Sequence, residues 1–457
     1  MPKHLVIIGA GAAGLPVASH VRRKNKDLEI TVITDREYFA YSPCGIPFVL
    51  SGAISSFDSL IMRNEEYYKD LNIKLINRTS VTRIDIDNNS IFYGTEKIKY
   101  DILVIASGAK PISPPIPGIN LEGVYFLNSL EDAFKISNAI NSSKNPTIIG
   151  AGAIGLEMAH AFLKKGLRVR VIEMKDHVLP NLLDKDMGDI VSEYLSSLKM
   201  EIHTSTVASA LLGDNKVEYI QANGNKYPTD LVLVSVGVRP NVKLAVDAGI
   251  EIGATGGIIT DASLRVKRKG RFIENVYACG NCVEATDIIT HKPTISALGS
   301  TAIRQGIVVA DNILGKNSVF GSISSPSIAV VGELEIGSVG VTKEKAIDYG
   351  IYPIEGKARG LTRARYYPRG EEIYVKILSD SDYRVIGTQV ISKEGVKGRI
   401  DAMSLLIGRK TTVHQVATSE TSYAPPISSV LDPLTMAARK IIEPKEWIIL
   451  LDFKYLI

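Results

Sequence analysis

The sequence predicts an α/β protein with two doubly wound domains followed by a smaller α+β domain. A glycine-rich turn lies between an apolar run and an alanine-rich helical stretch near the N-terminus, and the same arrangement returns at residues 147–155. The 457-residue length leaves room for a third domain, at about 150 residues per domain. Since 45% of the residues are hydrophobic and only 22% are charged, the chain can bury sizeable cores.

The first turn has the spacing of a dinucleotide-binding loop. Residues 5–8 form an apolar run that we interpret as a buried parallel strand, and Gly9-x-Gly11-x-x-Gly14 follows. Gly9 permits the tight turn, Gly11 lets the backbone approach a pyrophosphate, and Gly14 lets the helix pack closely. The unpaired N–H groups of the helix start then face the phosphates. The predicted contacts here are Gly9, Gly11, Ala12, Ala13 and Gly14.

A second strand, residues 29–34, is expected to end beside this loop. An acidic residue at such a strand end binds the ribose hydroxyls of a dinucleotide. In this chain the acidic residue is Asp35, or the acidic position lies one residue earlier and is occupied by Thr34 instead. Both stay open, and the predicted contacts are Thr34, Asp35 and Arg36.

The second loop repeats the pattern and ends differently. Gly150, Gly152 and Gly155 take the three glycine positions, with Ile154 beside them, and the strand at residues 168–173 ends in Glu173. A carboxylate there accepts hydrogen bonds from a ribose 2′-hydroxyl and repels a 2′-phosphate. We therefore expect NADH to be preferred over NADPH, although Lys175 could weaken that preference.

Two dinucleotide loops imply two cofactors, a flavin and a nicotinamide nucleotide. Three further apolar runs end in small residues that suit a nucleotide edge: Ala106, Ser107 and Gly108; Gly237; Gly280 and Asn281. Closely spaced prolines after residue 110 indicate a stiff linker between domains. We predict a discontinuous FAD domain (1–112 and 246–322), an inserted NAD(P) domain (113–245) and a C-terminal domain (323–457).

Together these segments resemble the pyridine nucleotide-disulfide oxidoreductases nearly end to end, specifically the branch of coenzyme A disulfide reductases, NADH oxidases and NADH peroxidases. The resemblance implies FAD at the first loop, at residues 106–108 and at Gly280-Asn281, and a nicotinamide nucleotide at residues 150–173. It also implies a C-terminal dimerisation domain. The family usually has Asp where this chain has Asn281 and often has Thr where it has Ser107. An amide still forms hydrogen bonds there, so we expect FAD to bind.

Cys44 is the predicted redox residue. Prolines at 43 and 47 restrict its segment, and we expect a helix start there that stabilises the thiolate. Its position matches the redox cysteine of the family, with Ser42 and Pro43 beside the flavin. Dithiol relatives carry a second cysteine about five residues later, where this chain has Val49. Cys44 is therefore expected to act alone, as a mixed disulfide or a sulfenic acid. We interpret Cys279 and Cys282 as structural rather than as an auxiliary redox pair.

The residue at position 12 distinguishes the members of this branch. NADH oxidases and NADH peroxidases carry a histidine there, whereas this chain has Ala12. Coenzyme A disulfide reductases lack that histidine and use tyrosines of the partner subunit. The candidates here are Tyr366, Tyr367 and Tyr423, since a phenol can donate a proton to a leaving thiolate. Glu157 resembles the family glutamate near the nicotinamide and flavin rings. Arg22 and Arg23 are predicted to bind coenzyme A phosphates.

The predicted function is reduction of a small disulfide, coenzyme A disulfide in the first place, by NAD(P)H through FAD and Cys44. The alternatives are an NADH oxidase, a polysulfide or sulfur reductase, and an NADH-sensing flavoprotein with little turnover.

We expect a homodimer and no metal. A net charge of +4 in scattered clusters argues against nucleic acid. No apolar run reaches the roughly 20 residues of a membrane span, and we expect a cytoplasmic protein without a signal peptide.

Overall fold

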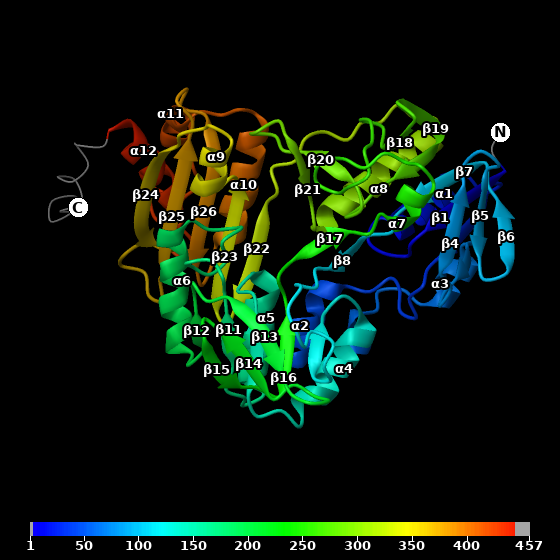
Figure 1. Ribbon diagram of the computed structural model, residues 1–457. Coiled ribbons are helices and arrows are strands. Elements are labelled where there is room, and N and C mark those ends of the chain that lie inside the picture. The colour runs from blue at the N-terminus through cyan, green and yellow to red at the C-terminus, as the bar shows by residue number, and fades with distance from the viewer. Residues whose placement is uncertain (1–2, 444–457) are drawn as a thin grey trace.

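The computed structural model describes residues 3–443, and its first domain is built on a six-stranded sheet of order β18-β19-β7-β1-β2-β3 (Figure 1). The strands from β19 to β3 run parallel, and β18 is antiparallel to β19. The predicted apolar runs become its central strands, which are buried on both faces. These strands are β1 (His4–Ile8), β2 (Glu29–Ile33), β3 (Lys74–Ile76), β7 (Ile102–Ile105), β18 (Arg265–Arg268) and β19 (Arg271–Ala278).

Each face of this sheet is covered by a separate layer. One core lies between the sheet and two helices that pack together, α1 (Gly14–Lys24) and α8 (Gly299–Ile313). The other core lies under a small antiparallel sheet and a short helix. These are β4 (Val81–Asp85), β5 (Ser90–Tyr93), β6 (Glu96–Lys99) and α7 (Lys243–Asp247). At the periphery lie α3 (Glu65–Asp70), β20 (Glu284–Thr286) and β21 (Pro293–Ile295).

The second domain has a five-stranded parallel sheet of order β12-β11-β10-β16-β9. Its strands are β9 (Val124–Phe126), β10 (Pro146–Ile149), β11 (Arg170–Ile172), β12 (Glu201–His203) and β16 (Leu231–Val234). One face packs on α4 (Leu130–Ile140), α5 (Ala153–Lys164) and α6 (Lys185–Ser197). The other packs on β13 (Ala208–Leu212), β14 (Tyr219–Ala222) and β15 (Asn225–Pro228).

Two short strands carry the chain between these domains. β8 (Ala109–Pro111) leads out of the first domain and β17 (Val238–Pro240) leads back, and the two pair antiparallel. After β17 the chain forms α7, which packs on β4 of the first domain. The first domain is thus discontinuous in sequence, with the second domain inserted into it.

The C-terminal domain is an antiparallel sheet of order β22-β23-β26-β25-β24. Its strands are β22 (Ser327–Val331), β23 (Leu334–Gly340), β24 (Ile354–Leu361), β25 (Glu372–Ser379) and β26 (Val385–Ser392). One face packs on α10 (Val396–Gly408), α11 (Val413–Thr418) and α12 (Pro433–Ile442). The other contributes Val331, Leu334, Ile336 and Ile391 to the core of the second domain.

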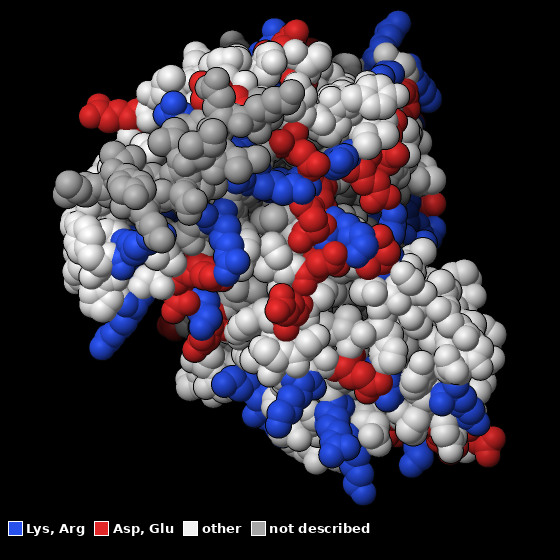
Figure 2. Space-filling view, turned by 90° about the vertical axis from the view of Figure 1, so that its left-hand side faces the viewer, with Lys and Arg blue, Asp and Glu red and all other residues white. Residues whose placement is uncertain are grey.

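Charges of both signs cover the side of the molecule formed by α6 and the C-terminal sheet, where Figure 2 shows acidic and basic side chains interleaved. Behind this surface the Lys376 ammonium is almost fully buried and lies 2.7 to 2.9 Å from three carboxylates. These are Asp184, Asp186 and Glu355. The cluster ties β25 and β24 to the start of α6. Among the described helices none is long and apolar enough to cross a membrane.

Candidate active site

The first glycine loop has the geometry that its spacing predicts. Gly9 has φ +110°, and a Cβ there would lie 2.2 Å from the Ala106 carbonyl oxygen. A Cβ at Gly14 would lie 2.0 Å from the Gly9 carbonyl oxygen. A Cβ at Gly11, by contrast, would meet no atom within 4 Å among the described residues. Packing therefore requires the outer two glycines, while Gly11 and the exposed Ala12 leave an open surface beside a helix start, which fits a pyrophosphate.

Residues distant in sequence meet at this loop, because β1, β7 and β19 are neighbours and their carboxyl ends share one edge. A Cβ at Gly280 would lie 3.0 Å from the Ala13 Cβ. The Gly280 N–H donates to Gln305 Oε1 at 2.7 Å, and this buried side chain of α8 was not identified from the sequence. Gly108 has φ +67°, and the preceding Ser107 hydroxyl donates to the Asn241 carbonyl at 2.7 Å. Ala106 and Asn281 complete this edge.

The end of β2 shows how the first ribose position differs from the second. Ile33 pairs with Ile8 as Ile172 pairs with Ile149, so Thr34 occupies the position that Glu173 has in the second domain. Thr34 is buried, and its hydroxyl oxygen accepts the Arg36 N–H at 3.3 Å. The Asp35 side chain is 61% exposed and lies 3.8 Å from Arg36 Nε. Asp35 thus presents the carboxylate at this edge, and Thr34 holds the turn.

The second loop repeats the glycine geometry in the same places. A Cβ at Gly150 would lie 2.4 Å from the Ser235 carbonyl oxygen, and one at Gly155 would lie 2.1 Å from the Gly150 carbonyl oxygen. A Cβ at Gly152 would contact no described atom within 4 Å. Exposed Ile154 lies in the first turn of α5, and Gly237, with φ +107°, follows β16 on the same edge.

Glu173 lies buried at the end of β11 and accepts two backbone hydrogen bonds. The Ala151 N–H donates to its Oε2 at 2.7 Å, and the Lys175 N–H donates to its Oε1 at 2.9 Å. The carboxylate therefore lies against the glycine loop, in the position that suits the hydroxyls of an adenosine ribose. The donors, the open glycine and the carboxylate together fit a dinucleotide.

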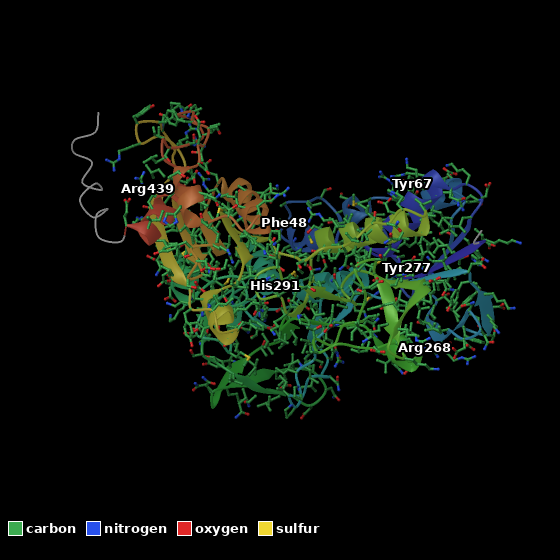
Figure 3. All side chains as sticks on the ribbon, turned by 90° about the horizontal axis from the view of Figure 1, so that it is seen from above. Phe48, Tyr67, Arg268, Tyr277, His291 and Arg439 are labelled. Carbon is green, nitrogen blue, oxygen red and sulfur yellow. The ribbon has the colours of Figure 1, made fainter. Side chains whose placement is uncertain are left out.

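Cys44 lies in a 3₁₀ turn, η1 (Pro43–Gly45), that leads into the short helix α2 (Ile46–Leu50). Antiparallel contacts fix the chain before it: the Ser42 N–H donates to the Leu60 carbonyl at 3.0 Å, at the end of η2 (Phe57–Leu60). Helix α2 packs on α4 and α5 of the second domain, and Figure 3 shows Phe48 of α2 midway between the two ends of the molecule. The thiol is exposed at this junction of domains.

The prediction of a stabilised Cys44 thiolate was wrong for the protein chain by itself. Partial burial raises the pKa of the Cys44 thiol above its ordinary value, and the nearby Glu157 carboxylate raises it further. Helix α2 has only five residues, and a backbone hydrogen bond at Cys44 is the only lowering influence among the described groups. Desolvation and like charge therefore outweigh the helix start.

Glu157 is the residue of the second domain that the structure brings to Cys44. It lies on α5, half buried, and its Oε1 accepts the Val330 N–H of β22 at 3.2 Å. Burial raises the pKa of its carboxyl to about 7, against the lowering effect of that hydrogen bond. A group that gains and loses a proton near neutral pH beside a thiol is suited to acid–base chemistry.

The three predicted tyrosines lie together in the C-terminal domain, whereas Cys44 lies in η1 of the first domain. The Tyr366 and Tyr423 hydroxyls are 2.8 Å apart, and this hydrogen bond raises the pKa of Tyr423. The Tyr367 N–H donates to the Ala364 carbonyl in the same loop. Figure 1 shows α11 and α12, which flank Tyr423, at the top of the C-terminal domain and α2 at the lower centre.

The prediction for Arg22 needs correction. Its side chain is 2% exposed, and its guanidinium donates to four backbone carbonyl oxygens at 2.7 to 3.2 Å. It therefore fastens the end of α1 to the loops before β2 and β3 and has no face left for a phosphate. The Arg23 side chain, by contrast, is exposed and donates to the Tyr67 hydroxyl at 3.3 Å. Arg63 lies over the same ring, 5.0 Å from its centroid, and was not identified from the sequence.

The other two cysteines are fully buried and unpaired. Cys279 belongs to the core under α1 and α8, and Cys282 belongs to the core on the opposite side of the sheet. The Cys282 thiol donates to the Cys279 carbonyl, with an S–O distance of 3.3 Å, and burial raises the pKa of both thiols. These contacts favour the structural interpretation of both residues.

Comparison with known proteins identifies the family. Residues 3–306 match the family described as pyridine nucleotide-disulphide oxidoreductase, and residues 326–434 match its dimerisation domain. The chain belongs to this family. It is therefore an NAD(P)H-dependent flavoprotein oxidoreductase with two nucleotide-binding domains and a dimerisation domain, which confirms the predicted fold class.

Similar proteins carry several activities in their names. An NADH oxidase of Methanocaldococcus jannaschii is 43% identical over 442 residues, which are 95% of this chain and 97% of that protein. A CoA-dependent NAD(P)H sulfur oxidoreductase of Pyrococcus furiosus is 34% identical, covering 96% and 98% of the two chains. The solved NAD-dependent persulfide reductase from A. fulgidus is 36% identical with a TM-score of 0.94, covering 98% of this chain and 84% of that one.

Proposed function

We propose that this protein uses NADH and FAD to reduce coenzyme A disulfide through Cys44. The observation that carries the proposal is the setting of that cysteine. Its thiol is exposed at the junction of the two nucleotide-binding domains, beside a glutamate with a pKa of about 7. The remaining two cysteines are buried, so an internal disulfide with Cys44 has no partner.

The cofactors have matching surfaces at the two glycine loops. Gly11, Ala12 and Gly280 would hold FAD, with Asp35 at its ribose. Gly152 and Glu173 would hold NADH. FAD, when bound, carries the electron pair from NADH to sulfur. The protein contributes the positions of the groups and the exclusion of water between them.

The sulfur chemistry needs a nucleophile and an acid. The Cys44 thiolate attacks one sulfur of the disulfide, so that a Cys44–S–S–CoA bond forms and one coenzyme A thiolate leaves. Tyr423 of the partner subunit donates a proton to that leaving thiolate. Two electrons from NADH then cleave the mixed disulfide, regenerate the Cys44 thiolate and release the second thiol. The sum is one disulfide, one NADH and one proton converted to two thiols and NAD⁺.

Glu157 controls the charge beside the sulfur. Below a pH of about 7 its carboxyl is mostly neutral and does not repel the Cys44 thiolate, whereas above that pH its charge raises the pKa of the thiol. A neutral Glu157 therefore favours the reactive form of Cys44. It also holds a proton within reach of the reacting groups.

A basic cluster on the first domain, formed by Arg23 and Arg63, suits the phosphates of coenzyme A. Arg23 and Arg63 both contact Tyr67, and the hydrogen bond from Arg23, together with smaller effects of Arg63, lowers the pKa of its phenol. Residues 40–42 run antiparallel to residues 60–62, so the segment that carries Arg63 lies beside the one that leads to Cys44. Arginine side chains bind phosphate through paired N–H groups, and Tyr67 holds both of them in place.

The tyrosines require a second subunit. Tyr366 and Tyr423 belong to the C-terminal domain, whose α11 and α12 are distant from α2 in Figure 1, and exposed apolar side chains follow Tyr423 in the sequence. These are Ile427, Val430 and Leu431. We infer a two-fold homodimer that covers this surface and brings the tyrosine pair of one subunit to Cys44 of the other.

An exposed free thiol suits a reducing compartment, so we place the protein in the cytoplasm.

Two other acceptors are supported by the names of similar proteins. A coenzyme A persulfide or polysulfide carries the same S–S bond, and the Pyrococcus and A. fulgidus proteins favour it. Oxygen is favoured by the Methanocaldococcus protein. The deciding experiment compares steady-state NADH oxidation with coenzyme A disulfide, polysulfide and oxygen. Fastest turnover with coenzyme A disulfide supports the proposal. Fastest turnover with oxygen, or negligible turnover with every acceptor despite flavin reduction, overturns it.

A further inference from the structure

The first turn of α9 (Lys343–Asp348) is one of the places where all three domains meet. Three successive residues of this turn each contact another domain. The Lys343 N–H donates to Asp184 at 2.7 Å, Glu344 Oε1 lies 2.8 Å from Lys175 Nζ, and Lys345 Nζ lies 2.8 Å from Asp287. The C-terminal domain thus reaches the coenzyme edge of the second domain through Glu344.

Lys175 lies directly beside the ribose position. Its backbone N–H donates to Glu173 Oε1 at 2.9 Å, and Met174 between them is 69% exposed. A phosphate on the 2′-oxygen of a ribose bound at Glu173 would extend over this exposed segment. The ammonium that could neutralise that phosphate is the one on Lys175, and it is paired with Glu344 instead. Glu344 and Asp348 of α9 both raise the pKa of Lys175, as does the neighbouring Asp176.

We propose that Glu344 sets the coenzyme preference by holding the Lys175 ammonium away from the 2′-position. It is a positioning residue, because it acts through Lys175 and does not touch the coenzyme. The proposal rests on the coenzyme half of the proposed function and is independent of the electron acceptor. It predicts that a chain with a lysine two residues after its ribose carboxylate still prefers NADH.

The anchoring of α9 keeps Glu344 in place. Asp184, which accepts the Lys343 N–H, also pairs with the buried Lys376, so the start of α9 is joined to an ion cluster inside the protein. Lys175 and Glu344 themselves are about half exposed. An exposed ion pair contributes little to stability, so breaking it should change coenzyme selection while leaving the fold intact.

The test uses the FAD-loaded protein with the variant Glu344→Gln. Calorimetry measures binding of 2′,5′-ADP, which carries the 2′-phosphate, and of ADP, which lacks it. Anaerobic stopped-flow spectroscopy measures flavin reduction by NADPH and NADH. We expect the variant to bind 2′,5′-ADP about threefold to tenfold more tightly than the wild type, and ADP within about twofold. Flavin reduction at low NADPH concentration should accelerate by the same factor.

Two matched variants separate the proposed contact from general effects of charge. Glu344→Gln combined with Lys175→Met should lose the gain for 2′,5′-ADP, because no ammonium remains to be released. Asp247→Asn makes the same charge change in an exposed pair with Lys243 on α7 and should give no gain. A gain that persists in the double variant, an equal gain in Asp247→Asn, or no gain in Glu344→Gln overturns the proposal. Since no readout contains a disulfide, failure of coenzyme A disulfide turnover would count against the proposed function alone.

Discussion

Cys44 and the Cys279–Cys282 pair show how the surroundings of a thiol determine its use. Cys44 lies exposed within a 3₁₀ turn, at a junction of domains and beside a titrating carboxyl. Cys279 and Cys282 have redox-like spacing, yet they are fully buried on opposite sides of one sheet. A substrate sulfur can reach only the first. Access, more than spacing, therefore separates a redox cysteine from a structural one.

Removing the exposed thiol should have the largest effect. Cys44→Ser should lose coenzyme A disulfide reduction by at least about 10³-fold, because a serine hydroxyl does not attack a disulfide. Flavin reduction by NADH should stay within about threefold of the wild type, since the glycine loops are unchanged. Steady-state kinetics measures disulfide reduction, and stopped-flow kinetics measures flavin reduction by NADH. Wild-type disulfide turnover in this variant would contradict the role of Cys44.

The buried cysteines should affect stability instead. Cys282→Ala removes a sulfur from a closed core and should lower the free energy of unfolding by about 1–3 kcal/mol. Disulfide turnover per folded enzyme should remain, as shown by activity normalised to bound flavin. Denaturant unfolding measures the free energy of unfolding of the variant and of the wild type. A variant as stable as the wild type but without turnover would assign the buried pair a redox role.

Glu157 should make stability depend on pH. Its pKa in the folded chain is about 7, above the ordinary 4.5, so the folded state holds an extra proton between these values. Stability therefore falls as the pH rises through this window. Relative to the wild type, Glu157→Gln should gain up to about 1–2 kcal/mol in unfolding free energy between pH 5 and pH 8. Parallel denaturant titrations at the two pH values measure it, and an unchanged difference would contradict it.

The smallest expected effect is that of Glu157→Gln on the reactivity of the Cys44 thiol. In Glu157→Gln the pKa of Cys44 should fall, because the carboxylate no longer repels the thiolate. Alkylation of Cys44 by iodoacetamide at pH 8 should accelerate about threefold to tenfold. Rates measured from pH 6 to 9 with mass-spectrometric assignment give the profile. Superimposable profiles for the two proteins would show that Glu157 does not act on Cys44.

The sequence predicts the fold well because its strongest signals are local. The spacing of Gly9 and Gly14 reflects contacts within one loop, and apolar runs of four residues are sufficient to mark central strands. Arg22 shows the limit, because adjacent basic residues look alike until the chain folds and one of them is buried. The contacts of Gln305 with Gly280, 25 residues away, and of Glu344 with Lys175, 169 residues away, leave no local pattern. The pKa of Cys44 likewise depends on a glutamate from another domain.

The antiparallel pair of β8 and β17 has a consequence for how such a chain can be assembled. Pro111 lies opposite Val238 and Ala109 lies opposite Pro240, so the outgoing and returning crossings meet like the two arms of a hairpin. The second domain is therefore connected to the first through two adjacent strands, and α2 adds a further contact by packing on α4 and α5. The coenzyme-binding domain is thus an insertion whose two connections to the first domain lie side by side.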